Sequence, residues 1–273
     1  MKKLRISTLL LVLFLVACAT SPTGRKQLML VSEETAISSS AQAYTAQMGT
    51  LQKEGKLSTD KALINRVNAI TGRLVSQAIL MRPETDKWKW SVAVIDDSET
   101  VNAWCMAGGR MALYTGLVTQ LKPSDDELAQ VMGHEIAHAL ANHTAEKMSM
   151  AMASSIGVAA VGIATDSGAA LAGAAAAAAL AVNLPNSRAA ETEADRIGIE
   201  LAAKAGYDPA AAVTLWQKMG SVSKTKVPQF ISTHPNPENR QKTLAALGPQ
   251  MEPYYKAPGK RPSYPLSSQA ILK

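Results

Sequence analysis

Three of the four histidines in this 273-residue chain fall within ten residues of one another. Two of them flank a glutamate in the segment His134-Glu135-Ile136-Ala137-His138, which has the H-E-x-x-H spacing. Because residues i and i+4 share one face of a helix, both imidazoles can bind the same metal ion. Glu135 lies about 100° around the helix from His134, close enough to take a proton from a metal-bound water molecule. Zinc suits two nitrogens and one carboxylate with a fourth position left for water, so the spacing predicts a hydrolytic zinc site.

The third histidine of the group, His143, is the nearest candidate for a further ligand. On a continuing helix it points about 140° away from His138, so the two cannot share a metal ion. A chain break of the H-E-x-x-H-x-x-G-x-x-H type would need a glycine and a histidine where this sequence has Ala141 and Thr144. We therefore expect His143 to be structural.

An acidic segment further along the chain offers a better ligand. In Glu191-Thr192-Glu193-Ala194-Asp195, Glu191 and Asp195 share a helix face while Glu193 points elsewhere. That face would carry one ligand carboxylate and one carboxylate that orients a ligand imidazole. An ordinary acidic first turn, favoured by the helix dipole, explains the segment equally well. The fourth histidine, His234, could approach the metal, donate to an oxyanion or cap local structure.

The H-E-x-x-H segment needs a helix, and the sequence supplies its beginning. Ser124-Asp125-Asp126-Glu127 is a capping box, which predicts a helix from Ser124 to about Met150. Hydrophobic periodicity predicts further helices at 32–53, 59–79, 188–205, 209–219 and 237–247, and strands at 88–95 and 110–114. The pair Gly108-Gly109 lacks the spacing of a phosphate loop and predicts a bend that leads into the second strand. These elements predict an α+β fold that is mainly α.

These motifs together resemble one family. The H-E-x-x-H segment, the Glu191-x-Glu193-Ala194-Asp195 segment and His234-Pro235 followed by Arg240 are similar to the HtpX-like and Oma-type zinc metalloendopeptidases, to which the CAAX prenyl protease also belongs. Asn102-Ala103, Gly108-Gly109 and Tyr114-Thr115-Gly116-Leu117 resemble the strand that precedes the zinc helix in that family. The similarity covers roughly residues 25–247. Ala107 departs from it, because relatives usually have proline before the glycine pair.

The resemblance implies a zincin-like fold of the gluzincin type, with a small β-sheet beside the H-E-x-x-H helix. It implies one zinc ion per chain, held by His134, His138 and Glu191, with Glu135 as the catalytic base. Asp195 would support the site, and His234 and Arg240 match a His-Pro…Arg element whose histidine occupies or guards the open metal position. We expect a peptide carbonyl to be held against the strand at 110–114.

The N-terminus has the features of a bacterial lipoprotein signal. Basic residues precede an apolar run at 6–17 that is too short to span a bilayer, and Leu15-Val16-Ala17-Cys18 resembles a lipobox. We expect a signal peptide at 1–17, lipidation of Cys18 and a tether at 18–30. Ala19 after the cysteine suggests sorting to the outer membrane. The catalytic domain is expected at 31–250 and a proline-rich tail at 251–273.

An alanine-rich stretch at 151–182 interrupts the catalytic domain. Asp166 and Gly168 divide it into halves that are each too short to cross a membrane. We expect a helical insertion of two small-residue helices that pack against the protein, with a membrane-dipping hairpin as the alternative.

Composition excludes several other classes of protein. With 47% hydrophobic and 18% charged residues, the chain is neither disordered nor a polytopic membrane protein. Removal of 1–17 takes away three basic residues and lowers the net charge from +6 to +3. No basic cluster interleaved with aromatic residues is present, so we expect no nucleic-acid partner. If Cys18 is lipidated, Cys105 has no disulfide partner and is expected to be a buried thiol.

The sequence therefore predicts a periplasm-facing, lipid-anchored zinc endopeptidase of the bacterial envelope. The resemblance suggests quality control, with misfolded envelope proteins as substrates. The alternative is a lipoprotein chaperone or assembly factor with a latent, self-inhibited zinc site. No feature of the sequence indicates an oligomeric state.

Overall fold

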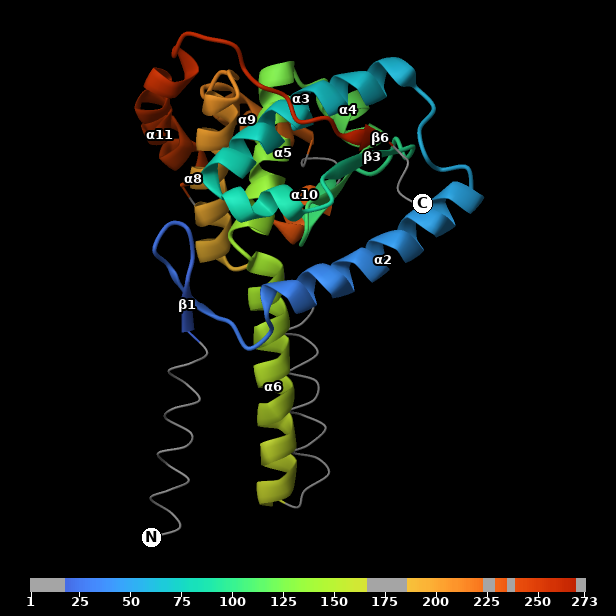
Figure 1. Ribbon diagram of the computed structural model, residues 1–273, viewed down its shortest axis with the longest axis vertical. Helices are drawn as coiled ribbons and strands as arrows, with labels where there is room; N and C mark the ends of the chain where they lie inside the picture. The colour runs from blue at the N-terminus through green and yellow to red at the C-terminus, as the bar shows by residue number, and fades with distance from the viewer. Residues whose placement is uncertain (1–17, 166–185, 223–228, 235–238, 269–273) are drawn as a thin grey trace. The chain divides into compact units, whose positions relative to one another are not determined.

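A computed structural model describes residues 18–165, 186–222, 229–234 and 239–268 (Figure 1). The chain forms two compact units. The first consists of 1–36 and 142–184, and the second of 37–141 and 185–273. The predicted signal peptide and the part of the alanine-rich stretch beyond Thr165 lie outside the described residues.

The second unit contains most of the secondary structure. Its helices are α2 (Glu33–Lys53, from Ile37 onward), α3 (Lys61–Met81), the short 3₁₀ helix η1 (Pro83–Lys87), α4 (Thr115–Leu121), α5 (Asp125–Leu140), α8 (Arg188–Lys204), α9 (Ala211–Val222), α10 (Gln229–Thr233) and α11 (Arg240–Tyr255). Its strands are β3 (Ser91–Ile95), β4 (Ala103–Met106), β5 (Arg110–Tyr114) and β6 (Ser267–Ser268). The expected α+β fold, mainly helical with a small sheet beside α5, is confirmed.

The four strands form one mixed sheet in the order β4-β5-β3-β6. β3 pairs in parallel with β5 and β6, and β4 pairs antiparallel with β5. A tight turn joins β4 to β5, in which the Gly109 N–H donates to the Met106 carbonyl. Gly108 is the third residue of this turn, with a φ of 84° that favours glycine. Ala107 precedes it, at the position where proline is favoured in such turns.

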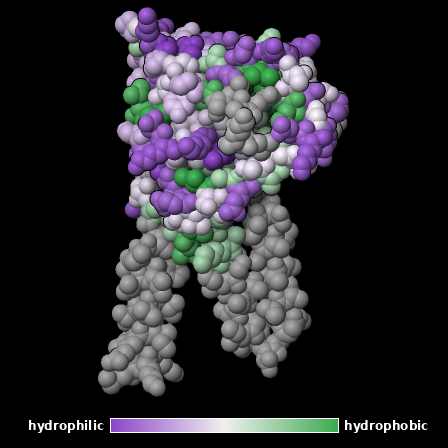
Figure 2. Space-filling view, turned by 45° about the vertical axis from the view of Figure 1, so that its right-hand side comes forward, coloured by the Kyte–Doolittle hydropathy of each residue, from purple (hydrophilic) through white to green (hydrophobic). Residues whose placement is uncertain are grey.

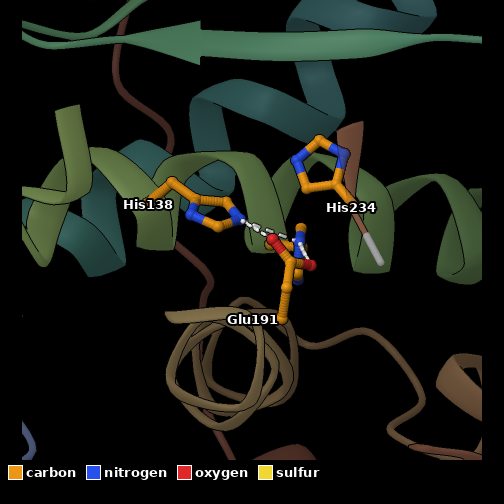
Figure 3. A group of neighbouring side chains, drawn as sticks. His138, Glu191 and His234 are labelled. Atoms are coloured by element: carbon orange, nitrogen blue, oxygen red, sulfur yellow. Dashed lines mark hydrogen bonds and ion pairs between the residues drawn. The ribbon is translucent and has the colours of Figure 1, made fainter. Parts of the chain in front are cut away.

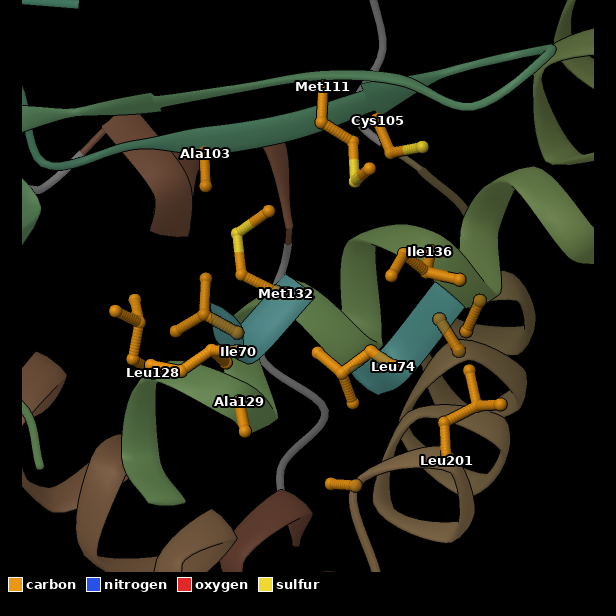
Figure 4. Packing of buried hydrophobic residues seen from close by; sticks show 14 of the residues in the cluster. Ile70, Leu74, Ala103, Cys105, Met111, Leu128, Ala129, Met132, Ile136 and Leu201 are labelled. Carbon is orange, nitrogen blue, oxygen red and sulfur yellow. The ribbon is translucent and has the colours of Figure 1, made fainter. Parts of the chain in front are cut away.

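The sheet is buried on both faces, because different helices cover each one. Tyr44 and Met48 of α2 pack against Ala93, Ile95 and Ala112 on one face. On the other face, apolar side chains of the strands meet those of α3 and α5 (Figure 4). In Figure 1, α8, α9 and α11 gather beside α5, away from the sheet. α5 is therefore enclosed by the sheet and by other helices.

The predicted capping box begins α5 as expected. The Ser124 hydroxyl accepts from the Glu127 N–H, and the Glu127 carboxylate accepts from the Ser124 N–H at 2.8 Å. Glu127 also accepts hydrogen bonds from Lys218 and Thr214 of α9. These contacts join the start of the H-E-x-x-H helix to α9.

Two predicted helix boundaries were wrong. The helix expected to continue to Met150 ends at Leu140, and Asn142 has a φ of 55° before a new helix, α6 (His143–Thr165). Asparagine tolerates this left-handed backbone better than most residues do. The last helix begins at Arg240 and continues through Pro249 and Pro253 to Tyr255, beyond the expected end at Leu247.

The expected strands were partly correct. The strand at 110–114 matches β5, but the one at 88–95 is shorter, because the 3₁₀ helix η1 and its C-cap Trp88 occupy its beginning. Strand β4 and the short elements α10 and β6 were not predicted. Each has only two to five residues, too few for a periodic pattern.

The first unit contains the strands β1 (Cys18–Thr20) and β2 (Lys26–Leu28) and the helix α6. β1 and β2 form an antiparallel pair that begins at Cys18. Arg25, in the turn between them, makes a two-pronged ion pair with Glu146 of α6, at 2.7 and 2.6 Å. Within the stretch expected as a tether, residues 18–28 thus form a hairpin that is bound to α6.

The surface is mainly polar. The face drawn in Figure 2 carries mostly hydrophilic residues with small apolar patches among them. Among the described residues, no helix combines the length and the apolar character needed to cross a membrane.

Candidate metal centre

The H-E-x-x-H helix α5 crosses helix α8 at two glycines. A Cβ atom at Gly133 would lie 2.9 Å from the Gly198 carbonyl oxygen. A Cβ atom at Gly198 would lie 2.8 Å from the backbone nitrogen of His134. Any side chain at either position would therefore push the two helices apart. This close approach allows Glu191, in the first turn of α8, to reach the histidines of α5.

Four buried side chains place one donor atom each at the same point. His134, His138, Glu191 and His234 have donor atoms that all lie within 4.8 Å of one another. The His134 and His138 Nε2 atoms are 3.0 Å apart, and each is 3.3 Å from a Glu191 carboxylate oxygen. Figure 3 shows Glu191 rising from α8 toward His138, with His234 above it.

These distances fit a tetrahedral metal site. Zinc–nitrogen and zinc–oxygen bonds of about 2.0–2.1 Å at tetrahedral angles place ligand atoms about 3.3 Å apart. Without a metal ion, two neutral imidazoles with facing Nε2 atoms at 3.0 Å are compatible only if one of them carries its proton on Nε2 and donates it to the other. Among the described residues, the Glu191 Oε1 and Glu135 Oε1 atoms are buried without a hydrogen-bond partner. A cation at this point would satisfy the Glu191 oxygen.

A second group of residues holds this cluster in place. His134 Nδ1 lies 3.0 Å from the Asp195 carboxylate, so it donates there and leaves Nε2 as the ligand atom. Arg240 donates to Asp195 at 2.5 Å and to Glu191 at 3.3 Å. Its guanidinium lies 3.6 Å from the centre of the Trp216 ring. Arg240 is thus a buried cation that offsets two buried carboxylates.

The surroundings shift the pKa of each titratable group in the cluster. Burial alone lowers the pKa of His134, but its hydrogen bonds with Asp195 and Glu191 outweigh burial and raise it to about 9. Burial raises the pKa of Glu191, but the His134 and His138 imidazoles, each 3.3 Å from a carboxylate oxygen, outweigh it and hold this pKa well below the usual range. Burial raises the pKa of Glu135 to about 8. Glu191 is therefore ionised, as a ligand must be, while Glu135 is adapted to hold a proton.

His234 faces the cluster from the segment that follows α10. Its Nδ1 donates to the Phe230 carbonyl at 3.0 Å, which leaves Nε2 free to face inward. The Nε2 atom is 3.5 Å from the Glu135 carboxylate. Burial lowers the pKa of His234 to about 4, so the ring is neutral and can act as a donor to a metal.

The free edge of the sheet borders the cluster at β4. The Tyr114 N–H donates to the Asn102 carbonyl, so the alternating antiparallel pattern turns the N–H and C=O groups of Ala103 and Cys105 away from β5. The Cys105 backbone N–H lies beside the Glu135 carboxylate and lowers its pKa, though less than burial raises it. The strand expected to hold a peptide, 110–114, is β5, and both of its edges are paired. That expectation was wrong, because in the described part of the chain the unpaired sheet edge beside Glu135 belongs to β4.

The structure gathers seven of the residues singled out in the sequence: His134, Glu135, His138, Glu191, Asp195, His234 and Arg240. His143 is not in the four-donor group and belongs to the other unit. Trp216, Phe230 and Cys105 were missed as parts of the site. An aromatic residue on a helix and a lone cysteine give no sign in the sequence that they touch a distant motif.

Comparison with known proteins shows which family has this arrangement. The model of peptidase family M48 matches residues 62–247 of the chain. The chain belongs to peptidase family M48. The matched range includes both helices of the four-donor cluster, the β4 edge and Arg240.

Family M48 relatives are found in eukaryotes and in bacteria. The chain is 33% identical to the mitochondrial metalloendopeptidase OMA1 of Bos taurus over 257 residues, 89% of this chain and 48% of that protein. It is 37% identical to the mitochondrial metalloendopeptidase OMA1 of Arabidopsis thaliana over 57% of this chain and 31% of that protein. It is 28% identical to the beta-barrel assembly-enhancing protease of Yersinia pestis over 71% of this chain and 41% of that protein. The matched regions thus span between 31% and 48% of the length of these relatives.

Proposed function

We propose that this M48 protein is a zinc-dependent endopeptidase. One observation supports this above the others: the donor atoms of His134, His138 and Glu191 lie 3.0–3.3 Å from one another, with the buried carboxylate of Glu135 beside them. Two imidazoles and one carboxylate are a ligand set of catalytic zinc sites. When bound, zinc would polarise a peptide carbonyl and lower the pKa of an attacking water molecule.

Glu135 performs the proton transfers in this proposal. Its carboxylate accepts the proton of the attacking water molecule and returns it to the leaving amine. In the metal-free chain, burial raises the pKa of Glu135 to about 8, so its carboxylate is more basic than that of an exposed glutamate. Asp195 keeps His134 in the tautomer that presents Nε2 to the metal, and Arg240 keeps Asp195 in place.

The edge of β4 binds the substrate backbone in this proposal. The outward C=O groups of Ala103 and Cys105 can accept hydrogen bonds from an extended peptide, as in strand addition to a sheet edge. The Cys105 N–H already reaches Glu135, so a peptide paired there would place a carbonyl next to the base. His234 holds the fourth donor position, and it must move away for substrate to enter. The resting form is therefore self-inhibited.

A comparison of two glutamate variants tests the proposed activity. Glu135→Gln removes the base and keeps the shape of the side chain, and Glu99→Gln makes the same change at an exposed position. We expect both variants to retain one zinc per chain, and only Glu135→Gln to lose cleavage of an unfolded protein such as β-casein, by about a hundredfold or more. Equal cleavage by both variants would disprove the mechanism.

The proposed location is the bacterial envelope. The lipobox ending at Cys18, and the name of the beta-barrel assembly-enhancing protease of Yersinia pestis, support a periplasm-facing, outer-membrane lipoprotein that removes misfolded envelope proteins. Mass spectrometry of protein purified from bacterial membranes tests the anchor. We expect a lipid-modified N-terminal Cys18, and a Cys18→Ala variant without lipid; an unmodified cysteine in the wild type would contradict it.

The four-donor cluster also favours a second candidate. With His234 as a fourth ligand, the metal would have no open position, as expected of a chaperone or assembly factor with a latent site. This candidate predicts that Glu135→Gln supports normal assembly of envelope proteins in cells, whereas the endopeptidase predicts a defect.

A further inference from the structure

A second cavity lies at the opposite end of α8 from the metal cluster. It has a volume of about 360 Å³, within the range of sites that bind ligands. It lies between the ends of α3, α8 and α11 and the strap that follows α11. Its lining consists of Gln77, Leu80, Met81, Lys204, Tyr254, Ala257, Lys260, Arg261 and Pro262.

The charged residues of this lining are all cations. Arg261 is fixed, because its guanidinium donates to the carbonyls of Lys204, Tyr254, Tyr255 and Ala257. Lys204 lies over the Tyr254 ring at 4.9 Å and pairs with Glu200 of its own helix. Lys260 is exposed at the rim. No aspartate or glutamate lines the cavity; with Lys204 paired to Glu200, Lys260 and Arg261 leave it with a positive charge toward a ligand.

The same cavity displays unusual apolar surface. Leu80 is 69% exposed and Tyr254 is 41% exposed, and both are among the five large hydrophobic residues that are exposed in the described part of the chain. Met81 and Pro262 extend this surface within the cavity. Apolar side chains next to cations suit a ligand that combines apolar and acidic groups.

We propose that this cavity is an exosite that binds an acidic, apolar segment of a protein substrate. An acidic side chain would meet Lys260 and Lys204, while a neighbouring apolar side chain would pack on Leu80 and Tyr254. A peptide fits better than a lipid surface, because the apolar groups line a recess and only one of its three cations is fully exposed. The inference rests on the proposed endopeptidase function.

Helix α8 fixes the distance between this exosite and the metal cluster. Lys204 follows Glu191 by thirteen residues on the same helix, which places them about 20 Å apart. An extended peptide covers this distance with about six residues. Substrates would therefore carry the acidic, apolar segment at least about six residues from the bond that is cleaved.

Binding to the full-length mature Glu135→Gln chain tests the exosite without cleavage. The probe is a fluorescent octapeptide of alternating leucine and glutamate, and the control peptide alternates leucine and lysine. We expect the acidic peptide alone to bind, with an affinity that falls as salt is raised. Lys260→Glu and Leu80→Ser should each weaken binding about five- to tenfold, whereas Lys61→Glu, a charge reversal at the other end of α3, should not.

Cleavage by the wild-type chain provides the second measurement. A substrate with the acidic segment eight residues from the scissile bond should have a lower KM than the same substrate without it, and Lys260→Glu should remove only this difference. Equal binding of the two octapeptides would overturn the proposal. So would binding that Lys260→Glu and Leu80→Ser leave unchanged, or binding to phosphatidylglycerol vesicles in place of the peptide. Loss of catalysis with intact peptide binding would instead overturn the proposed function alone.

Discussion

The two ends of helix α8 carry charge in opposite ways. At its N-terminal end, Glu191 and Asp195 are buried among two histidines and Arg240, and Arg240 pairs with both carboxylates. At its C-terminal end, Lys204 and the neighbouring Lys260 stand beside exposed apolar side chains. The same helix thus carries buried, paired charges at its N-terminal end and more exposed charges at its C-terminal end.

This difference determines what each end can do. Buried charges interact strongly and hold a fixed geometry, but loss of one partner leaves another unpaired at a cost of several kcal/mol. Exposed charges are screened, contribute little to stability and steer binding. We therefore expect substitutions at the metal cluster to change metal affinity and folding, and substitutions at the cavity to change only recognition.

The largest effect is expected from Glu191→Gln. The amide keeps the size of the side chain but removes the anionic ligand and leaves Arg240 with one carboxylate fewer. We expect zinc affinity to fall by more than the hundredfold that loss of an outer residue costs. Competition with a fluorescent chelator measures this. Zinc affinity equal to the wild type would remove Glu191 from the ligand set.

Asp195→Asn should have a smaller effect on the same property. The carboxylate of Asp195 fixes the tautomer of His134 because it accepts the hydrogen of Nδ1. An uncharged amide accepts this hydrogen less strongly and can also turn its NH₂ group toward the ring. We expect a 10- to 100-fold loss of zinc affinity with one zinc still bound at saturation. The same titration serves as the measurement, with Glu99→Gln as the control. A loss as complete as that of Glu191→Gln would make Asp195 a direct ligand.

Gly198→Ala tests the helix crossing. A methyl group at this position would lie 2.8 Å from the backbone nitrogen of His134, so α5 and α8 must separate. We expect a loss of about 1–3 kcal/mol in the free energy of unfolding together with weaker zinc binding. Denaturant unfolding of the metal-free protein gives the first quantity. Gly220→Ala, on a helix with open space around it, is the matched control and should leave zinc binding unchanged and raise the free energy of unfolding by no more than about 1 kcal/mol.

Glu127→Gln tests a buried carboxylate away from the metal. Burial raises the pKa of Glu127, but hydrogen bonds with Lys218, Ser124 and Thr214 outweigh it and lower the pKa. A lowered pKa in the folded state stabilises the fold above the unfolded value of about 4.5, and this stability is lost as the pH falls below it. We expect the variant to be about 1–2 kcal/mol less stable at pH 7, with the difference shrinking below pH 4.5. A difference that grows in acid would contradict this assignment.

The smallest effect is expected from Lys260→Ser at the cavity. Lys260 is exposed, so its loss should change the free energy of unfolding by no more than about 0.5 kcal/mol and leave zinc affinity unchanged. Thermal unfolding and zinc titration measure both quantities. A large destabilisation would show that this end of α8 depends on its charges as the other end does.

The sequence predicted the parts of the site that lie within single helices. The pairs His134/His138 and Glu191/Asp195 follow helical periodicity, and the capping box at Ser124 marks the start of α5. The crossing of α5 and α8 could not be predicted, because Gly133 and Gly198 are 65 positions apart and each is unremarkable in its own helix. The geometry of the site depends on that contact.

Short or interrupted elements were the least predictable. Strand β4 has only four residues, yet it supplies the sheet edge beside Glu135. The sequence pattern instead indicated the longer strand β5 as the one that holds the peptide. The break at Asn142 depends on a left-handed backbone conformation, which an asparagine permits but does not require. Helix α11 continues through Pro249 and Pro253, which normally end helices, and buries Leu244 and Met251. Tertiary packing determines where these elements begin and end, and the pattern of a single sequence does not show which residues pack together.

The most direct test of the metal centre is anomalous diffraction at the zinc absorption edge from crystals of the purified chain. We predict one peak per chain, about 2.0–2.2 Å from His134 Nε2, His138 Nε2 and a Glu191 carboxylate oxygen. Asp195 should lie outside this ligand shell, in contact with His134 Nδ1. A crystal grown with zinc that shows no peak at this point, or a peak bound by Asp195 or Cys105 in place of Glu191, would contradict the account.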